Sequence, residues 1–218
     1  MDKQAPPWQA ATEMMGVAAY THFSTFTRLA ASVDMTPEVG AKGTLARLAV
    51  AEYARYTALE QAAIGYGFDL AEAMGPFVPV IDEYHRRTRA ADWVESLLKT
   101  YVGDGLTADL HRMLAERIDP DVGALIVSTL AHQQEEDFSL RALREALARH
   151  PDRVGRLTLY ARKLRGEAMT RARAALRRAQ SLADVTGADP GPLGEPQLVL
   201  ARLGQFHEGR MNVLGLAT

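Results

Sequence analysis

Residues 45–59 combine a helical apolar stripe with two charged side chains. Positions spaced alternately by three and four residues from Leu45 to Ala62 predict the packed face of a helix, and Glu52 and Arg55 stand on that face. Charged groups are almost never fully buried unless they are paired or bind a metal. We therefore expect polar partners for Glu52 and Arg55 inside a helical core.

Length and composition indicate one soluble domain. The chain has 218 residues, of which 47% are hydrophobic and 24% are charged, enough for a single sizeable core. No apolar run is long enough to cross a bilayer and no secretion signal opens the chain, so we expect a cytoplasmic protein without a membrane partner. The absence of cysteine excludes disulfides, thiolate metal sites and a cysteine nucleophile. Any metal would need His, Asp and Glu ligands, which suit iron, manganese or zinc.

The hydrophobic pattern predicts an all-α protein and offers no strand candidate. A capping box at Asp92–Glu95 and a proline at position 120 mark two helix starts. We expect one domain over residues 1–218, with a core bundle at about 12–149 followed by two additional C-terminal helices. The expected helices cover residues 12–31, 38–66, a short piece around 82–85, 92–117, 120–149, 153–183 and 197–214.

Four of these helices place ionisable groups on inward faces. In carboxylate-bridged two-metal bundles, two helices each supply a Glu and two supply Glu-x-x-His pairs. The carboxylates neutralise the cations, and open coordination positions remain for dioxygen. By this comparison, the candidate metal ligands are His22, Glu52, Asp104, His132 and Glu135.

Several longer motifs carry a family resemblance. They are LAVAE (48–52), MGPFV (74–78), DEYH (82–85), DWVE (92–95), KTYVGDG (99–105) and GEA (166–168). With these motifs, residues 16–169 resemble the actinobacterial ferritin-like proteins related to the tRNA-isopentenyladenosine hydroxylases. The resemblance implies a ferritin-like four-helix bundle and a non-haem di-iron oxygenase or hydroxylase.

The expected ligands of that family are largely substituted here. His22 stands where the family has a carboxylate, Arg55 replaces the His of an E-x-x-H pair, and His132 with Glu135 reverse the last acid–His pair. Arg55 stays protonated and cannot bind a metal. With three carboxylates against Arg55 and two histidines, the cluster is neutral without a metal if both histidines are protonated. This charge balance disfavours an intact di-iron centre.

Three functions follow as alternatives. The first is an oxygenase or hydroxylase that acts on a small molecule through a rearranged site holding one or two iron ions. The second is a metal-free enzyme in which His132 and Glu135 are an acid–base pair and Arg55 holds an anionic group. The third is a structural or binding bundle without catalysis, which needs no cofactor because Arg55 replaces the metal.

The remaining expectations concern partners and single residues. We expect a homodimer formed through apolar surface on the third and the C-terminal helices. The arginine-rich segment 141–180 is interpreted as a solvated helix face, so no nucleic-acid partner is expected. Asp82 and His85 share a helix face and are assigned surface or capping roles. Glu167 is expected to support the site or to pair with a neighbouring arginine.

Overall fold

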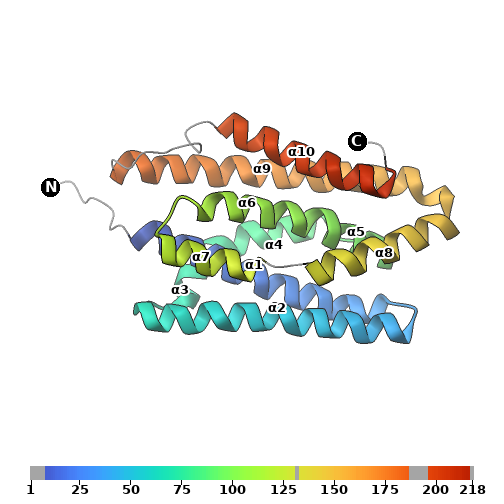
Figure 1. The fold of residues 1–218 in the computed structure, drawn as a ribbon, viewed down its shortest axis with the longest axis horizontal. Coiled ribbons are helices and arrows are strands. Elements are labelled where there is room, and N and C mark those ends of the chain that lie inside the picture. Colours follow the sequence, from blue (N-terminus) through green and yellow to red (C-terminus); the bar gives the residue numbers. More distant parts are fainter. Residues whose placement is uncertain (1–7, 131–132, 187–195, 217–218) are drawn as a thin grey trace.

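Two antiparallel helices form the first half of the bundle. The computed structural model describes residues 8–130, 133–186 and 196–216. Helix α1 (Trp8–Met35) is followed by α2 (Val39–Tyr66), which runs back along it (Figure 1). Helix α2 ends at Gly67, whose φ of 78° lies in the left-handed region that favours glycine.

Short elements then carry the chain across the bundle. They are α3 (Leu70–Met74), the 3₁₀ turn η1 (Gly75–Phe77) and α4 (Val78–Arg87). No helix was expected between residue 66 and the short piece around 82–85, so the sequence did not predict helix α3 and turn η1. Asp69 caps α3 by accepting a hydrogen bond from the backbone N–H of Ala71 at 2.7 Å.

The third helix of the bundle is interrupted by a π-helical segment. Helix α5 (Trp93–Leu98) leads into η2 (Lys99–Asp104) and then into α6 (Gly105–Ala115). The predicted cap is present, since the carboxylate of Asp92 accepts from the N–H of Glu95 at 3.0 Å. Residues 94–103 are all buried. The expectation that this helix offers apolar surface for a dimer is therefore wrong over those residues.

The fourth helix is divided as well. Helix α7 (Pro120–Thr129) ends in a turn at Leu130, and α8 (Gln133–Arg149) follows, so the single helix predicted over 120–149 is wrong. Asp119 caps α7 and Pro120 is its first residue, as predicted. The turn η3 (Pro151–Arg153) leads to α9 (Val154–Thr186), and α10 (Pro196–Leu214) closes the chain close to the predicted bounds.

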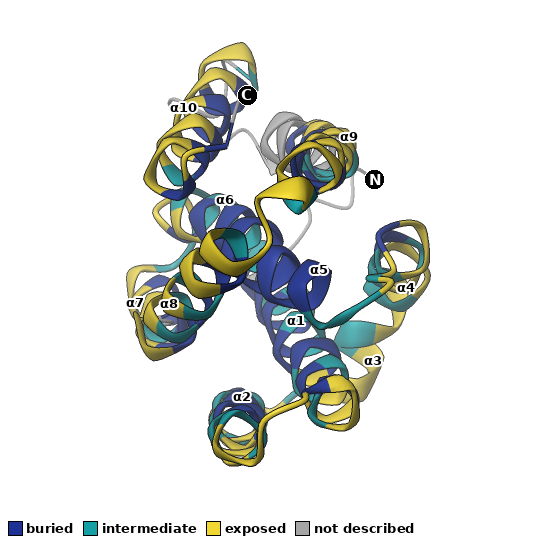
Figure 2. Ribbon diagram, turned by 90° about the vertical axis from the view of Figure 1, so that its right-hand side faces the viewer, coloured by how far each residue is buried: buried dark blue, intermediate teal, exposed yellow. Residues whose placement is uncertain are grey.

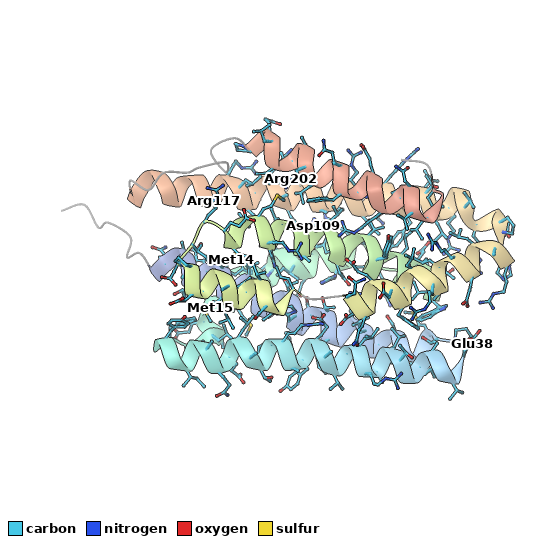
Figure 3. All side chains as sticks on the ribbon, in the orientation of Figure 1. Met14, Met15, Glu38, Asp109, Arg117 and Arg202 are labelled. Atoms are coloured by element: carbon cyan, nitrogen blue, oxygen red, sulfur yellow. The ribbon has the colours of Figure 1, made fainter. Side chains whose placement is uncertain are left out.

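Helices α1, α2, α5–α6 and α7–α8 make a four-helix bundle, and α9 and α10 cover its α5–α6 side (Figures 1 and 2). All described elements are helical, which confirms the all-α prediction. None of the described helices is both long and apolar enough to span a bilayer. Two apolar clusters occupy the α1–α2 half of the bundle. One includes Met14 and Met15 near the start of α1 (Figure 3), and the other is built on Leu29, Leu45 and Leu48.

Candidate functional site

A buried polar layer lies between these two apolar clusters. His22 follows Ala19 of one cluster and precedes Leu29 of the other on α1, while Glu52 stands between Leu48 and Leu59 on α2. The exposed fractions of His22 and Glu52 are 1% each, and that of Glu135 on α8 is 3%. The structure thus brings these three predicted residues into one core, as their helical spacing indicated.

Arg55 joins two of the carboxylates. Its Nη1 donates to Glu52 Oε1 at 2.5 Å and to Glu135 Oε1 at 2.7 Å. Burial alone lowers the pKa of Arg55, but its hydrogen bond to Glu135 and the charges of Glu52 and Glu135 outweigh burial and raise this pKa above its ordinary value. The guanidinium therefore links α2 to α8 as a fixed positive charge between two carboxylates.

His22 occupies the other oxygen of Glu52. Its Nδ1 lies 2.7 Å from Glu52 Oε2, and its Nε2 lies 3.0 Å from the hydroxyl oxygen of Thr129 on α7. The Thr129 hydroxyl has one proton and donates it to the carbonyl of Ile126 at 2.7 Å. A carboxylate only accepts, so Nδ1 of His22 donates to Glu52, while Nε2 lies beside the Thr129 hydroxyl.

Asp104 is paired with an arginine that sequence reasoning missed. The Nη2 of Arg28 on α1 donates to Asp104 Oδ2, and its Nη1 donates to the hydroxyl of Thr100 at 3.0 Å. Asp104 and Thr100 both belong to the π-helical η2, and single π turns inside α-helices are frequent at functional sites. The predicted inward position of Asp104 is confirmed, but its partner comes from α1.

These groups surround a hollow about the size of one water molecule. It is lined by Thr25, Leu29, Thr100, Gly105 and four carboxylates, those of Glu52, Asp104, Glu135 and Glu136. The space open to the centre of a water-sized sphere is about 10 Å³, close to the lower limit for one water. The Oε2 atom of Glu135 is buried and has no hydrogen-bond partner among the described residues. A water in the hollow could therefore donate to this oxygen.

Each of the four carboxylates already forms an ion pair with an arginine side chain. Arg55 serves Glu52 and Glu135, Arg28 serves Asp104, and Arg210 of α10 lies 3.6 Å from Glu136. Arg210 also donates to Asp109 of α6, labelled in Figure 3, at 2.6 Å. Three arginines from three helices thus supply positive charge around the hollow.

The donor set does not fit a two-metal centre. Both oxygens of Glu52 and both ring nitrogens of His22 already make hydrogen bonds, and a guanidinium lies between Glu52 and Glu135. Within the described ranges, no three His, Asp or Glu side chains are grouped so that they could hold a metal ion. His132, predicted as a ligand and as the acid–base partner of Glu135, lies outside the described residues.

A second buried group adjoins this site through Arg28. Lys99 of η2, 2% exposed, donates from Nζ to the carbonyl of Thr88 at 3.1 Å and lies 5.3 Å from the centre of the Tyr84 ring. Burial and the nearby charge of Arg28 lower the pKa of Lys99 to about 7. The sequence did not reveal Lys99, because in a regular helix position 99 lies opposite the packed face that runs through Leu97 and Tyr101.

The other singled-out residues make structural contacts. Tyr20 of α1 donates to Asp82 at 2.6 Å, and Ser24 lies 3.2 Å from His85 Nε2, so Asp82 and His85 fasten α4 to α1 separately. Glu167 pairs with Arg171 at 2.8 Å and with Arg87 at 3.5 Å, which confirms its predicted ion pair.

Comparisons with known proteins bear on the family to which this bundle belongs. A search of the curated proteins found no match. A family model described as the ferritin-like domain of actinomycetes matches residues 8–189, which include every helix of the four-helix bundle and α9. The polar layer between α1, α2, η2 and α8 therefore lies in the core of the matched region, and the chain belongs to the actinomycete ferritin-like domain family.

Proposed function

We propose that this protein is a metal-independent ferritin-like bundle, in which a salt-bridge network centred on Arg55 takes the place of a metal centre. We further propose that it acts through its surfaces, as a structural protein, and not as an oxygenase. The observation that carries the proposal is the position of Arg55, whose Nη1 contacts both Glu52 and Glu135. A guanidinium between two carboxylates supplies the charge that a bound cation would otherwise supply.

The iron-dependent alternative is disfavoured by the same contacts. A hydroxylase like those acting on tRNA-isopentenyladenosine would need the oxygens of Glu52 and Glu135 as ligands, and Arg55 holds one oxygen of each. Adding ferrous ions beside Arg55 would bring like charges within a few ångströms in a buried core. At an effective dielectric of 20, two unit charges 4 Å apart repel by about 4 kcal/mol.

The metal-free enzyme is disfavoured by the small size of the hollow and by the ion pairs that Arg55 already makes. The hollow beside Glu135 has room for about one water molecule and none for an organic substrate. Arg55, the proposed anion holder, is already bound to two carboxylates. The Oε2 of Glu135, which has no hydrogen-bond partner among the described residues, is an observation in favour of acid–base chemistry, and a water in the hollow would satisfy it.

Metal content tests the proposal. The wild type and the double variant His22→Glu, Arg55→His, which restores two ligand types expected from the family resemblance, would be purified anaerobically with iron supplied. We expect less than about 0.1 metal ion per wild-type chain, because the guanidinium excludes cations from the site. The double variant is expected to retain more iron. One or two ions per wild-type chain, held by Glu52 and Glu135, would disprove the proposal.

A further inference from the structure

The outer face of α2 carries a second stripe, separate from the one that faces the core. Its members are spaced alternately by four and three residues over the length of the helix, and only one of them is charged. Figure 2 shows α2 at the edge of the bundle with exposed residues on its outer side, and α2 packs mainly on α1. It consists of Val39, Gly43, Ala46, Val50, Tyr53, Thr57, Glu60 and Ile64.

The apolar members of this stripe are open to solvent. The exposed fractions are 84% for Val39, 65% for Val50, 65% for Ile64 and 44% for Tyr53. A repeat of seven residues with two apolar positions is the pattern by which two helices pack in a coiled coil. Four exposed apolar side chains aligned along one helix face are typical of an interaction surface.

Gly43 leaves space for a close approach on the same stripe. Glycine is unfavourable in the interior of a helix, so a glycine there often allows another segment of backbone to approach closely. A Cβ at Gly43 would meet nothing nearer than Arg47 Nη1 at 3.8 Å. The described chain therefore leaves room for a second helix to approach Gly43, as it does at other helical glycines such as Gly166.

The register of the stripe is self-complementary when two copies run antiparallel. The stripe reads the same from both ends about a point between Ala51 and Glu52, so each position meets another member of the stripe. In the pairs nearest to the twofold axis and at the two ends of the stripe, a larger side chain faces a smaller one. The facing pairs are Val39 with Ile64, Gly43 with Glu60, Ala46 with Thr57, and Val50 with Tyr53 of the partner subunit.

Charge complementarity supports the same register. Lys42 precedes Gly43, and Gly43 faces Glu60 of the partner subunit, so the ammonium of Lys42 lies beside that carboxylate. Lys42 and Glu60 stand on the same flank of the stripe, and an antiparallel pair brings equal flanks together. In a parallel pair, Glu60 would face Glu60 of the partner subunit, which is repulsive.

We propose that a second copy of this chain docks on the outer face of α2, forming an antiparallel α2–α2 homodimer about a twofold axis near Ala51. The interface is distinct from the buried polar layer, so it does not depend on whether that layer binds metal. Helix α2 has 28 residues and spans about 42 Å, which gives a contact of seven to eight turns.

Sedimentation of the full chain tests the surface. We expect the wild type to sediment at twice its 23.8 kDa, and Val50→Glu to raise the dimer Kd by more than about a hundredfold, because two carboxylates would be buried at the centre. Val213→Glu on α10 is the matched control, since Val213 is 44% exposed and lies outside the stripe. A monomeric wild type, or equal effects of the two variants, would overturn the proposal.

A charge exchange tests the register without relying on an apolar-to-charged change. Lys42→Glu is expected to raise the dimer Kd about five- to tenfold, because the ion pair occurs twice across the axis. The double variant Lys42→Glu, Glu60→Lys restores the pair and is expected to recover most of the affinity. If the double variant is as weak as the single one, Lys42 and Glu60 do not face each other and the register is incorrect.

Cross-linking distinguishes antiparallel from parallel pairing, and the absence of native cysteine makes the readout clean. Chains carrying Ala46→Cys alone and Thr57→Cys alone would be oxidised separately and as a mixture. The proposal predicts a disulfide-linked dimer in the mixture only. Efficient linkage of Ala46→Cys to itself would show a parallel pair, and no linkage in any sample would show that this face is not the interface.

Discussion

At the residue scale, the core depends most on Arg55. Replacing it with methionine removes the guanidinium that pairs with both Glu52 and Glu135. Removing one partner of a buried ion pair costs about 3–5 kcal/mol, so we expect Arg55→Met to lower the free energy of unfolding by about 3 kcal/mol. Urea unfolding followed by circular dichroism measures this change.

The control for that variant lies on α8. Arg141 is exposed, and Arg141→Met is expected to change the free energy of unfolding by less than about 0.5 kcal/mol. Equal effects of the two substitutions would mean that Arg55 makes no special contribution to the core.

Lys99 gives the fold a pH dependence. Its pKa is about 7 in the folded protein against 10.5 ordinarily, so between these values the unfolded chain binds a proton that the folded chain lacks. Stability therefore rises with pH across this window, by at most about 1.4 kcal/mol per unit. The charges facing Lys99 are those of Arg28 on α1, Asp104 on η2, and Lys163 and Arg171 on α9.

The matched variant for Lys99 is methionine, which keeps the length of the side chain. We expect Lys99→Met to have the larger free energy of unfolding at pH 7. Its advantage over the wild type should shrink as the pH rises from 7 to 9, because the wild type gains stability. Unfolding curves at pH 7, 8 and 9 give this difference. A constant difference would show that Lys99 is charged in the folded protein throughout.

Most of the polar layer could be predicted at this scale. Helical periodicity identified the inward positions of His22, Glu52, Arg55, Asp104 and Glu135, because a packed face repeats every three to four residues. Periodicity did not identify Arg28 or Arg210. Their long side chains reach carboxylates of other elements, and that reach depends on how the helices pack.

At the element scale, glycines decide how closely helices approach. A Cβ on Gly123 of α7 would lie 2.5 Å from the carbonyl oxygen of Ala115 at the end of α6. Because backbone must move to relieve this contact, we expect Gly123→Ala to destabilise the protein by about 1–3 kcal/mol. Gly166→Ala on α9 is the control, since a Cβ there meets nothing within 4 Å and alanine favours helix.

Thermal unfolding of the two glycine variants separates packing from propensity. We expect a lower Tm for Gly123→Ala and an equal or higher Tm for Gly166→Ala. A stabilised Gly123→Ala would mean that α6 and α7 are farther apart than described.

Two helix starts were predictable from the sequence, but the break between α7 and α8 was not. Asp69, Asp92 and Asp119 each cap a helix through local hydrogen bonds, and the capping box at Asp92 and the proline at position 120 predicted two of these three starts. Residues 124–149 contain neither glycine nor proline, so nothing in the local sequence marks the end of α7 at Thr129. That end places the Thr129 hydroxyl against His22, a tertiary contact that local patterns do not carry.

At the scale of the whole molecule, the fold places a charged layer between two apolar clusters and fills it with its own side chains. Arg28, Arg55 and His22 face Asp104, Glu52 and Glu135 across four elements of the bundle. An ion pair of this kind helps to fix one helix register, because a shifted register would leave a charge buried without a partner.

The effect of metal on stability tests most directly whether Arg55 replaces a metal ion in this layer. A ligand that binds only the folded state at a hundred times its Kd stabilises that state by about 2.7 kcal/mol. The free energy of unfolding would be measured anaerobically in excess ferrous ion and in excess chelator. Because Arg55 already fills the role of the cation, we predict the same value in both conditions. A wild-type protein stabilised by ferrous ion, with the gain removed by chelator, would contradict the replacement of the metal by Arg55.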